Sequence, residues 1–347
     1  MSGPLYVPVL PTRPHAADAY RRLRPDIQNA VAPLWTLPPR HGVPRAAVTA
    51  DIRGDLALVV KSQRYCPAWI DAPFADETEA SVFAELLPEV CSLGPLRPVT
   101  GPSRPEAQQT AVLTTARLSG NPLGIRVQVP GEWESGMADS VSDLLTRVGS
   151  AVRVDLLLDL AAVRADRPDA GKETLRALDA LVPLGHWRTV AVLAGGFPQV
   201  TADMLEDGPY EESRMDWQVW NEVRAGGRGY ARALSYGDYG IQPVAAISHT
   251  PRPRKGGPPW GVLRYTTDSS FILGKMLARG ADRVAYNRSV ARQIVDHHGF
   301  RGAAAGSAEA WIRACADDLC AGTGNFTTWL WVGNAQHMTY VVHSLRR

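Results

Sequence analysis

Three aspartates and three arginines stand at or near the ends of short apolar runs, where their side chains could share one site. They are Asp71, Asp159 and Asp238, with Arg13, Arg126 and Arg264. An aspartate between low-dielectric walls has a raised pKa and acts as an acid or base. An arginine beside it holds a carboxylate or phosphate through two hydrogen bonds. The combination predicts a site for a small anionic ligand, with acid/base hydrolysis or a lyase reaction as its chemistry.

The predicted residues divide into two roles. The catalytic candidates are Asp238, Asp159 and Tyr239, with Asp238 as the acid or base and Arg264 as the anion clamp. The predicted ligand-binding residues are Arg13, Asp71, Arg126, Arg214, Trp217, Arg264, Tyr265 and His337. A structural role competes with each aspartate, because an aspartate that follows a strand often caps the next helix.

The apolar runs recur about every 30 residues, and each is followed by a stretch with helical spacing. The eight runs are Leu5–Leu10, Ala32–Leu37, Ala68–Asp71, Leu96–Val99, Gly124–Val129, Val154–Leu160, Thr189–Leu193 and Ala231–Tyr236. Eight such units are typical of an α/β fold, the (β/α)8 or TIM-barrel class, here over residues 1–245. Active sites on this fold lie at the carboxyl ends of the strands, so the predicted residues should meet at one mouth.

The alternation of apolar runs and helical stretches ends after the eighth unit. We expect residues 246–347 to form an appendage packed on the barrel. Trp260–Thr266 reads as a strand, and Ser270–Leu277 continues as strand or helix. Helical stretches follow at 289–298, 308–319 and 326–344. Residues 251–259 are rich in proline, glycine and basic residues and are typical of a mobile loop. The pattern leaves open whether the appendage is a lid or a plug.

Composition excludes several classes of protein. The chain has 347 residues, 45% of them hydrophobic, and a net charge of +2, which is too mild for a nucleic-acid-binding face. No apolar run approaches the length of a membrane span, and no signal peptide precedes the first strand, so we expect a cytoplasmic protein. The four cysteines are far apart and are expected to be reduced thiols.

Short motifs add little. No metal site is predicted, because metal-binding histidine spacings are missing, and the cofactor is left open. The Gly195-Gly196 pair follows the seventh run, where barrels place phosphate-binding loops, but two residues make a weak motif. Longer nucleotide-binding and nucleophile-elbow motifs are also missing.

The order and spacing of several motifs resemble the "beta protein" family of bacteria and their viruses. They are YVPVL near the N-terminus, PLWTLPP about 25 residues on, SRMDWQVW (213–220), YGDYG (236–240), LRYT (263–266) and TTWLWVGNAQHM (327–338). The resemblance implies a barrel-type fold and draws attention to Arg214, Trp217, Asp238, Tyr239, Arg264, Tyr265 and His337. Family members tend to carry lysine after the first strand, whereas this chain has Thr12-Arg13, which argues against a Schiff-base mechanism there.

A second function stays open at this point. The family context implies a non-catalytic interaction component of a phage-related or anti-phage system, with a protein partner. A deep polar mouth would favour an enzyme, and a plugged mouth would favour a scaffold.

Overall fold

The computed structural model describes residues 3–249 and 258–347. Eight parallel strands close into a barrel, as the spacing predicts. They are β1 (Tyr6–Pro11), β2 (Leu34–Thr36), β3 (Ala68–Asp71), β4 (Leu96–Thr100), β5 (Leu123–Gln128), β6 (Val154–Ala162), β7 (Trp187–Gly195) and β9 (Leu234–Asp238). β9 pairs with both β7 and β1 and closes the ring. The TIM-barrel prediction is therefore confirmed.

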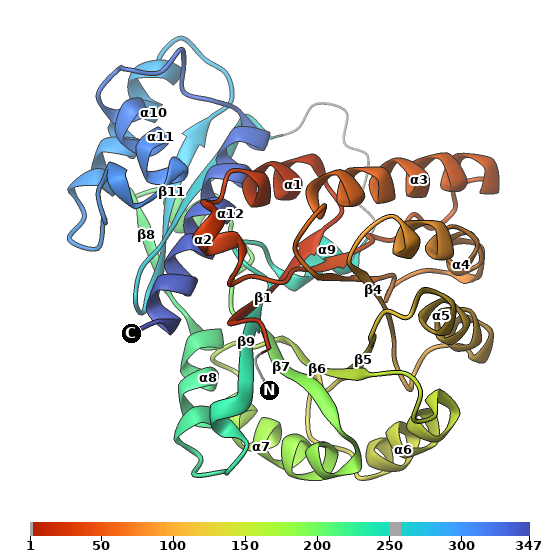
Figure 1. Cartoon of the computed structure of the whole chain (residues 1–347). Coiled ribbons are helices and arrows are strands. Elements are labelled where there is room, and N and C mark those ends of the chain that lie inside the picture. The colour runs from red at the N-terminus through yellow and green to blue at the C-terminus, as the bar shows by residue number, and fades with distance from the viewer. Residues whose placement is uncertain (1–2, 250–257) are drawn as a thin grey trace.

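Helices surround the strands as a ring (Figure 1). They are α1 (Pro14–Arg21), α2 (Pro25–Gln28), α3 (Arg45–Ser62), α4 (Glu77–Ser92), α5 (Glu106–Ser119), α6 (Gly136–Val148), α7 (Ala170–Leu181) and α8 (Met215–Ala225). Local chemistry sets their ends. The Asp76 carboxylate accepts from the backbone N–H of Glu79 while Glu79 reaches back to Asp76, so a capping box starts α4. Gly120, with a φ of 68°, adopts the left-handed conformation that ends α5.

Side chains alternate between the barrel interior and its outer face, because successive residues of a strand point in opposite directions. Along β6, Leu157 belongs to the inner apolar cluster, whereas Leu156 and Leu158 pack in the outer cluster against the helices. Asp159 shares the parity of Leu157 and faces inward. Along β9, Tyr236 packs in the outer cluster and Tyr239 in the inner one, so Asp238 and Tyr239 lie on opposite sides of the barrel wall.

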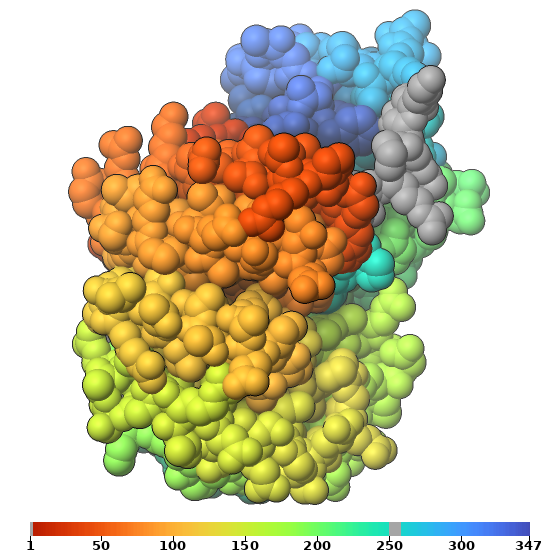
Figure 2. All heavy atoms as spheres, turned by 90° about the vertical axis from the view of Figure 1, so that its right-hand side faces the viewer, coloured from red at the N-terminus to blue at the C-terminus, as the bar shows by residue number. Residues whose placement is uncertain are grey.

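The C-terminal residues form an appendage beside the barrel. A three-stranded antiparallel sheet joins β8 (Tyr210–Ser213), β10 (Trp260–Thr266) and β11 (Ser270–Leu277) in the order β10–β11–β8. The remaining helices are α9 (Val244–Ser248), α10 (Arg283–Asp296), α11 (Ser307–Ala316) and α12 (Phe326–Leu345). Figure 2 shows the residues near the C-terminus as a lobe at the top of the molecule, above the side of the barrel.

Two elements tie this lobe to the barrel. α12 packs on α1 and on β1, so it occupies a place in the ring of helices next to β9 (Figure 1). β8 lies within residues 1–245 yet pairs with β11 of the lobe. The domain boundary after residue 245 stays a prediction. No helix in the described part of the chain is long and apolar enough to span a bilayer.

The structure adds elements that the apolar pattern did not predict, namely α2, β8 and α9. Each is four or five residues long, which is too short for a periodic signal. Ser270–Leu277 is a strand, which resolves the alternative left open by the sequence. Most of the predicted mobile loop, residues 251–257, lies outside the described residues.

Candidate functional site

The barrel interior holds a buried ionic cluster at the carboxyl ends of its strands, here called the lumen cluster: Asp71, Arg104, Arg126, Asp159 and Tyr239. Arg126 Nη1 donates to Asp71 at 2.9 Å, and its Nε donates to Asp159 at 2.9 Å. Arg126 Nη2 donates to the Tyr239 hydroxyl at 2.8 Å, and that hydroxyl donates to Asp159. Arg104 adds a second guanidinium 3.3 Å from Asp71.

The lumen cluster is electrically balanced, since two guanidinium groups face two carboxylates. Burial alone would lower the pKa of Arg126, but Asp159, Tyr239 and Asp71 together hold that pKa above its ordinary value. Burial, with Asp159 beside it, raises the pKa of Tyr239. Both groups are thereby fixed in one protonation state at neutral pH, and an incoming anion would have to displace a carboxylate from Arg126.

The mouth above the lumen cluster is covered by the chain itself. Ile247 of α9 is fully buried and belongs to the same inner apolar cluster as Tyr239. Val244 and Phe74 pack against that cluster from the rim. Apolar side chains at the carboxyl ends of the strands therefore close the barrel interior.

A second buried cluster lies outside the barrel wall, between β9, β10 and α12, and is here called the wall cluster: Tyr6, Asp238, Thr266 and His337. The Tyr6 hydroxyl donates to Asp238 at 2.5 Å, and His337 Nε2 donates to the other Asp238 oxygen at 2.9 Å. His337 Nδ1 shares a 2.8 Å hydrogen bond with the Thr266 hydroxyl. Burial alone would raise the pKa of Asp238, but the His337 and Tyr6 contacts hold that pKa below its ordinary value.

The Thr266–His337–Asp238 chain has the order of a nucleophilic triad. All three side chains are buried, and none of them lines a cavity found in the described residues. Gln336 also bonds both the N–H and the carbonyl of Thr266. The wall cluster therefore joins α12 to β9 and β10, and substrate has no route to it in this conformation.

Arg214 and Trp217 lie close to the wall cluster. Arg214 donates to the Tyr236 hydroxyl at 3.3 Å and pairs with Asp216 at 3.5 Å. Trp217 and Trp220 both contact the Tyr236 ring edge-on, because residues three apart lie on the same face of a helix. These residues pack α8 onto β9.

Gly195 and Gly196 stand where neighbouring residues leave no room for a side chain. A Cβ on Gly195 would meet Val244 Cγ2 at 2.3 Å, and one on Gly196 would meet an Asp216 carboxylate oxygen at 2.1 Å. A phosphate at this pair would face that carboxylate. The phosphate-loop interpretation therefore lacks support here.

An open cavity of about 520 Å³ lies where the ends of β7 and β9 meet the lobe, and we call it the Arg264 cavity. Its polar lining is Gln199, Gln242, His249 and Arg264, and its aromatic lining is Phe197, Trp260, Phe326 and Trp329. The lining contains no aspartate or glutamate among the described residues. Of the predicted site residues, Arg264 lies here.

Arg264 is half-buried, and its guanidinium has no carboxylate partner in the described part of the chain. Nη1 donates to the carbonyl of Val262 at 2.8 Å, and the guanidinium lies 5.5 Å from the Phe197 ring centroid. Nε is buried without a hydrogen-bond partner. Burial lowers the pKa of Arg264 to about 10, since no acid compensates for the lost hydration.

The predicted residue Arg13 lies near His15, which contacts the cavity lining through Gln242. His15 contacts Gln242 at 3.4 Å between its Nε2 and the amide oxygen. Burial, opposed by that contact and helped by the charges of Arg264 and Arg13, lowers the pKa of His15 to about 4. Arg13 is therefore near the cavity without lining it. Tyr265 faces the opposite side of β10, where its hydroxyl accepts from the backbone N–H of Arg301 at 3.0 Å.

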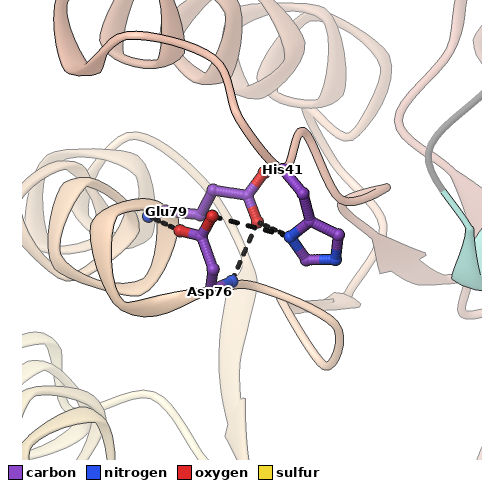
Figure 3. A group of neighbouring side chains, drawn as sticks. All are labelled: His41, Asp76 and Glu79. Atoms are coloured by element: carbon purple, nitrogen blue, oxygen red, sulfur yellow. Dashed lines mark hydrogen bonds and ion pairs between the residues drawn. The ribbon is translucent and has the colours of Figure 1, made fainter.

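His41, Asp76 and Glu79 have the spacing of a metal site, with donor atoms within 4.8 Å of one another (Figure 3). The capping box already explains the two carboxylates. One Glu79 oxygen accepts from the Asp76 N–H and the other from the Arg40 N–H, and one Asp76 oxygen accepts from Glu79. One free carboxylate oxygen and the exposed imidazole remain, which is too few donors for a stable metal site.

Sequence reasoning missed most of the Arg264 cavity. Gln242 and His249 follow β9 closely and could have been found from the barrel rule alone. Phe197 follows the end of β7 and carries the same signal. Trp260 and Phe326 carry no such signal, because their place in the cavity depends on how the lobe packs on the barrel.

The closed ring of parallel strands and the polar groups at its carboxyl ends define a TIM-barrel protein. The chain belongs to the Beta protein family, whose model matches residues 6–343. A comparison with curated proteins found no match. Among solved structures, the chain is similar to tryptophan synthase from M. tuberculosis in its aminoacrylate- and BRD0059-bound form. The identity is 13% over 67% of this chain and 82% of that chain, with a TM-score of 0.39. That similarity is too low to bear on function.

Proposed function

We propose that this barrel binds a small anionic ligand in the Arg264 cavity, beside the carboxyl ends of β7 and β9. The observation that carries the proposal is the Arg264 guanidinium, which faces the cavity without a carboxylate partner in the described chain. An arginine presents five N–H donors, and one of them is used here. A carboxylate or phosphate would supply both the missing acceptors and the missing charge.

The proposal is for binding, because the predicted acid/base groups are engaged elsewhere. Asp159 and Tyr239 bond Arg126 inside the plugged lumen, and Asp238 bonds His337 in the wall cluster. Hydrolase or lyase chemistry at Arg264 would need another acid or base, and His249 is the titratable group in the lining that could serve.

The test compares the parent protein with Arg264→Met at low ionic strength, using inorganic phosphate and sulfate as probes in calorimetry and thermal unfolding. An anion at one hundred times its Kd should stabilise the parent by about 2.7 kcal/mol, and the variant should show no such gain. Arg153→Met removes an exposed arginine and serves as the matched control. Equal anion responses in parent and Arg264→Met would contradict the proposal.

The variant should fold, because methionine keeps the apolar stem, leaves no buried carboxylate without its partner and removes only the hydrogen bond to the Val262 carbonyl. Removing a half-buried charge that has no carboxylate partner should raise the melting temperature of the ligand-free protein. The ligand-free melting temperature therefore separates a lost site from a damaged fold.

The plugged lumen favours a second candidate, a non-catalytic interaction component of a phage-related or anti-phage system. Ile247 and Tyr239 close the mouth where barrel enzymes take substrate. The phage-related part of this proposal rests on the family alone. Incubation with a mixture of metabolites, followed by mass spectrometry, tests it, since turnover of any component would contradict a non-catalytic role.

A further inference from the structure

The Arg264 cavity is much larger than an inorganic anion needs. Its volume of about 520 Å³ falls in the range of about 300–1,000 Å³ that is typical of sites for whole organic ligands. A phosphate or carboxylate held by Arg264 would fill a small part of it. The rest of the lining shows what the remainder of the ligand would touch.

That remainder is bounded by aromatic rings from three separate parts of the chain. Phe197 follows β7, Trp260 begins β10, and Phe326 and Trp329 begin α12. The Phe326 and Trp329 rings pack edge-to-face, with centroids 5.4 Å apart. Phe326 is 39% exposed and Trp260 is half-buried, so both keep surface that a ligand could cover.

Two amide side chains, Gln199 and Gln242, complete the polar part of the lining. Amides offer a donor and an acceptor each and add no charge. With Arg264 on one wall and aromatic rings on others, the cavity matches a ligand that is anionic at one end and planar and apolar at the other.

We propose that the ligand of this cavity is an aromatic anion, a planar ring that carries a carboxylate or a phosphate group. The inference rests on the proposed function, because Arg264 must first hold the anionic group. The ring would lie against Phe326 and Trp260, where edge-to-face and offset contacts are favourable.

The experiment compares matched pairs of probes by calorimetry: phosphate with phenyl phosphate, and acetate with benzoate. A nucleoside 5′-monophosphate adds a larger ring. Each aromatic anion should bind the parent at least about tenfold more tightly than its simple counterpart. The carboxylate and phosphate arms show which anionic group is preferred, and a preference for either supports the inference.

Phe326→Leu keeps apolar bulk at the cavity edge and removes the ring, and Phe326→Ala removes both. Both variants should lose most of the aromatic preference while simple phosphate binds as in the parent. Tyr65→Ala removes a ring that is 89% exposed and is not part of the lining, and should change neither affinity. Circular dichroism of each variant checks that α12 still folds.

The outcomes separate the two proposals. Two results would contradict the aromatic-anion inference and leave the proposed anion site intact. One is equal binding of simple and aromatic anions to the parent, and the other is an aromatic preference that persists in both Phe326 variants. If no anion binds the parent, the proposed function and this inference both fall.

Discussion

Glu309 should make the lobe less stable as the pH rises, which is opposite to the usual behaviour of a carboxylate. It lies in the first turn of α11, is fully buried, and neither carboxylate oxygen has a hydrogen-bond partner in the described chain. Burial, only partly offset by the nearby backbone and by the charge of Arg301, raises the pKa of Glu309 from 4.5 to about 7.

The sign follows from proton linkage. Between pH 4.5 and 7 the folded state keeps a proton on Glu309 that the unfolded state has released. The free energy of unfolding therefore falls as the pH rises through this window, and is flat above it. A shift of about 2.5 units corresponds to about 3 kcal/mol, of which roughly 2–3 kcal/mol is lost between pH 5 and pH 8.5.

Urea unfolding at a series of pH values, followed by tryptophan fluorescence, measures this change in the free energy of unfolding with pH. Glu309→Gln removes the titration and keeps the shape, so its free energy of unfolding should fall less between pH 5 and pH 8.5 than that of the parent, by that same 2–3 kcal/mol. Glu106→Gln, at an exposed position in the first turn of α5, is the matched control and should follow the parent. A Glu309→Gln profile that parallels the parent would refute the reasoning.

Two further perturbations address the buried clusters. Arg126→Met leaves Asp71 and Asp159 buried without their shared guanidinium and should lower the free energy of unfolding by about 3–5 kcal/mol; Arg45→Met, which breaks an exposed pair with Glu85, should cost less than about 1 kcal/mol in the same urea titration. His337→Ala should cost about 2–4 kcal/mol at pH 7; because it removes the contact that lowers the pKa of Asp238, it should also weaken the loss of stability as the pH falls below 4. Phosphate affinity should be unchanged in His337→Ala, and its loss would show that the wall cluster serves the ligand.

The barrel could be predicted from the sequence because its signal is periodic and local. Val154–Leu160 is a continuous apolar run of the kind that a doubly covered strand needs, and all eight predicted runs are barrel strands. The helical spacing that follows the third run is visible in the sequence at Phe83, Leu86, Leu87 and Val90, and these residues form the buried face of α4. Several helix and strand ends differ from the prediction by one to three residues, and α10 begins at Arg283, six residues before the predicted start at 289.

The site could be predicted only in part, because a residue at the end of a barrel strand can point either into the barrel or out toward the helices. Asp159 and Asp238 both lie at strand ends, but one points into the lumen and the other points out toward α12. A shift of one residue along a strand moves a side chain from the inner to the outer face of the barrel. Near Asp238 the apolar pattern does not show which face is inner, because the inward position beside it is Gly237, which has no side chain. The sequence thus brings these residues to one rim, and the structure separates them into two clusters.

The arrangement of the strands also explains why the arginine without a carboxylate partner, Arg264, lies where the lobe meets the barrel. Inside the barrel, inward-facing Arg126 of β5 pairs with inward-facing Asp159 on the neighbouring strand β6 and with Asp71 of β3, two strands away, so the closed ring balances its own charges. β10 lies in a sheet of three strands that meets the barrel beside β7 and β9, and the barrel strands offer Arg264 no facing carboxylate there. A half-buried guanidinium without a carboxylate partner costs stability, and substitution by methionine would remove that cost in one step. The anion that we propose for this cavity would supply the negative charge that the described part of the chain does not place beside Arg264.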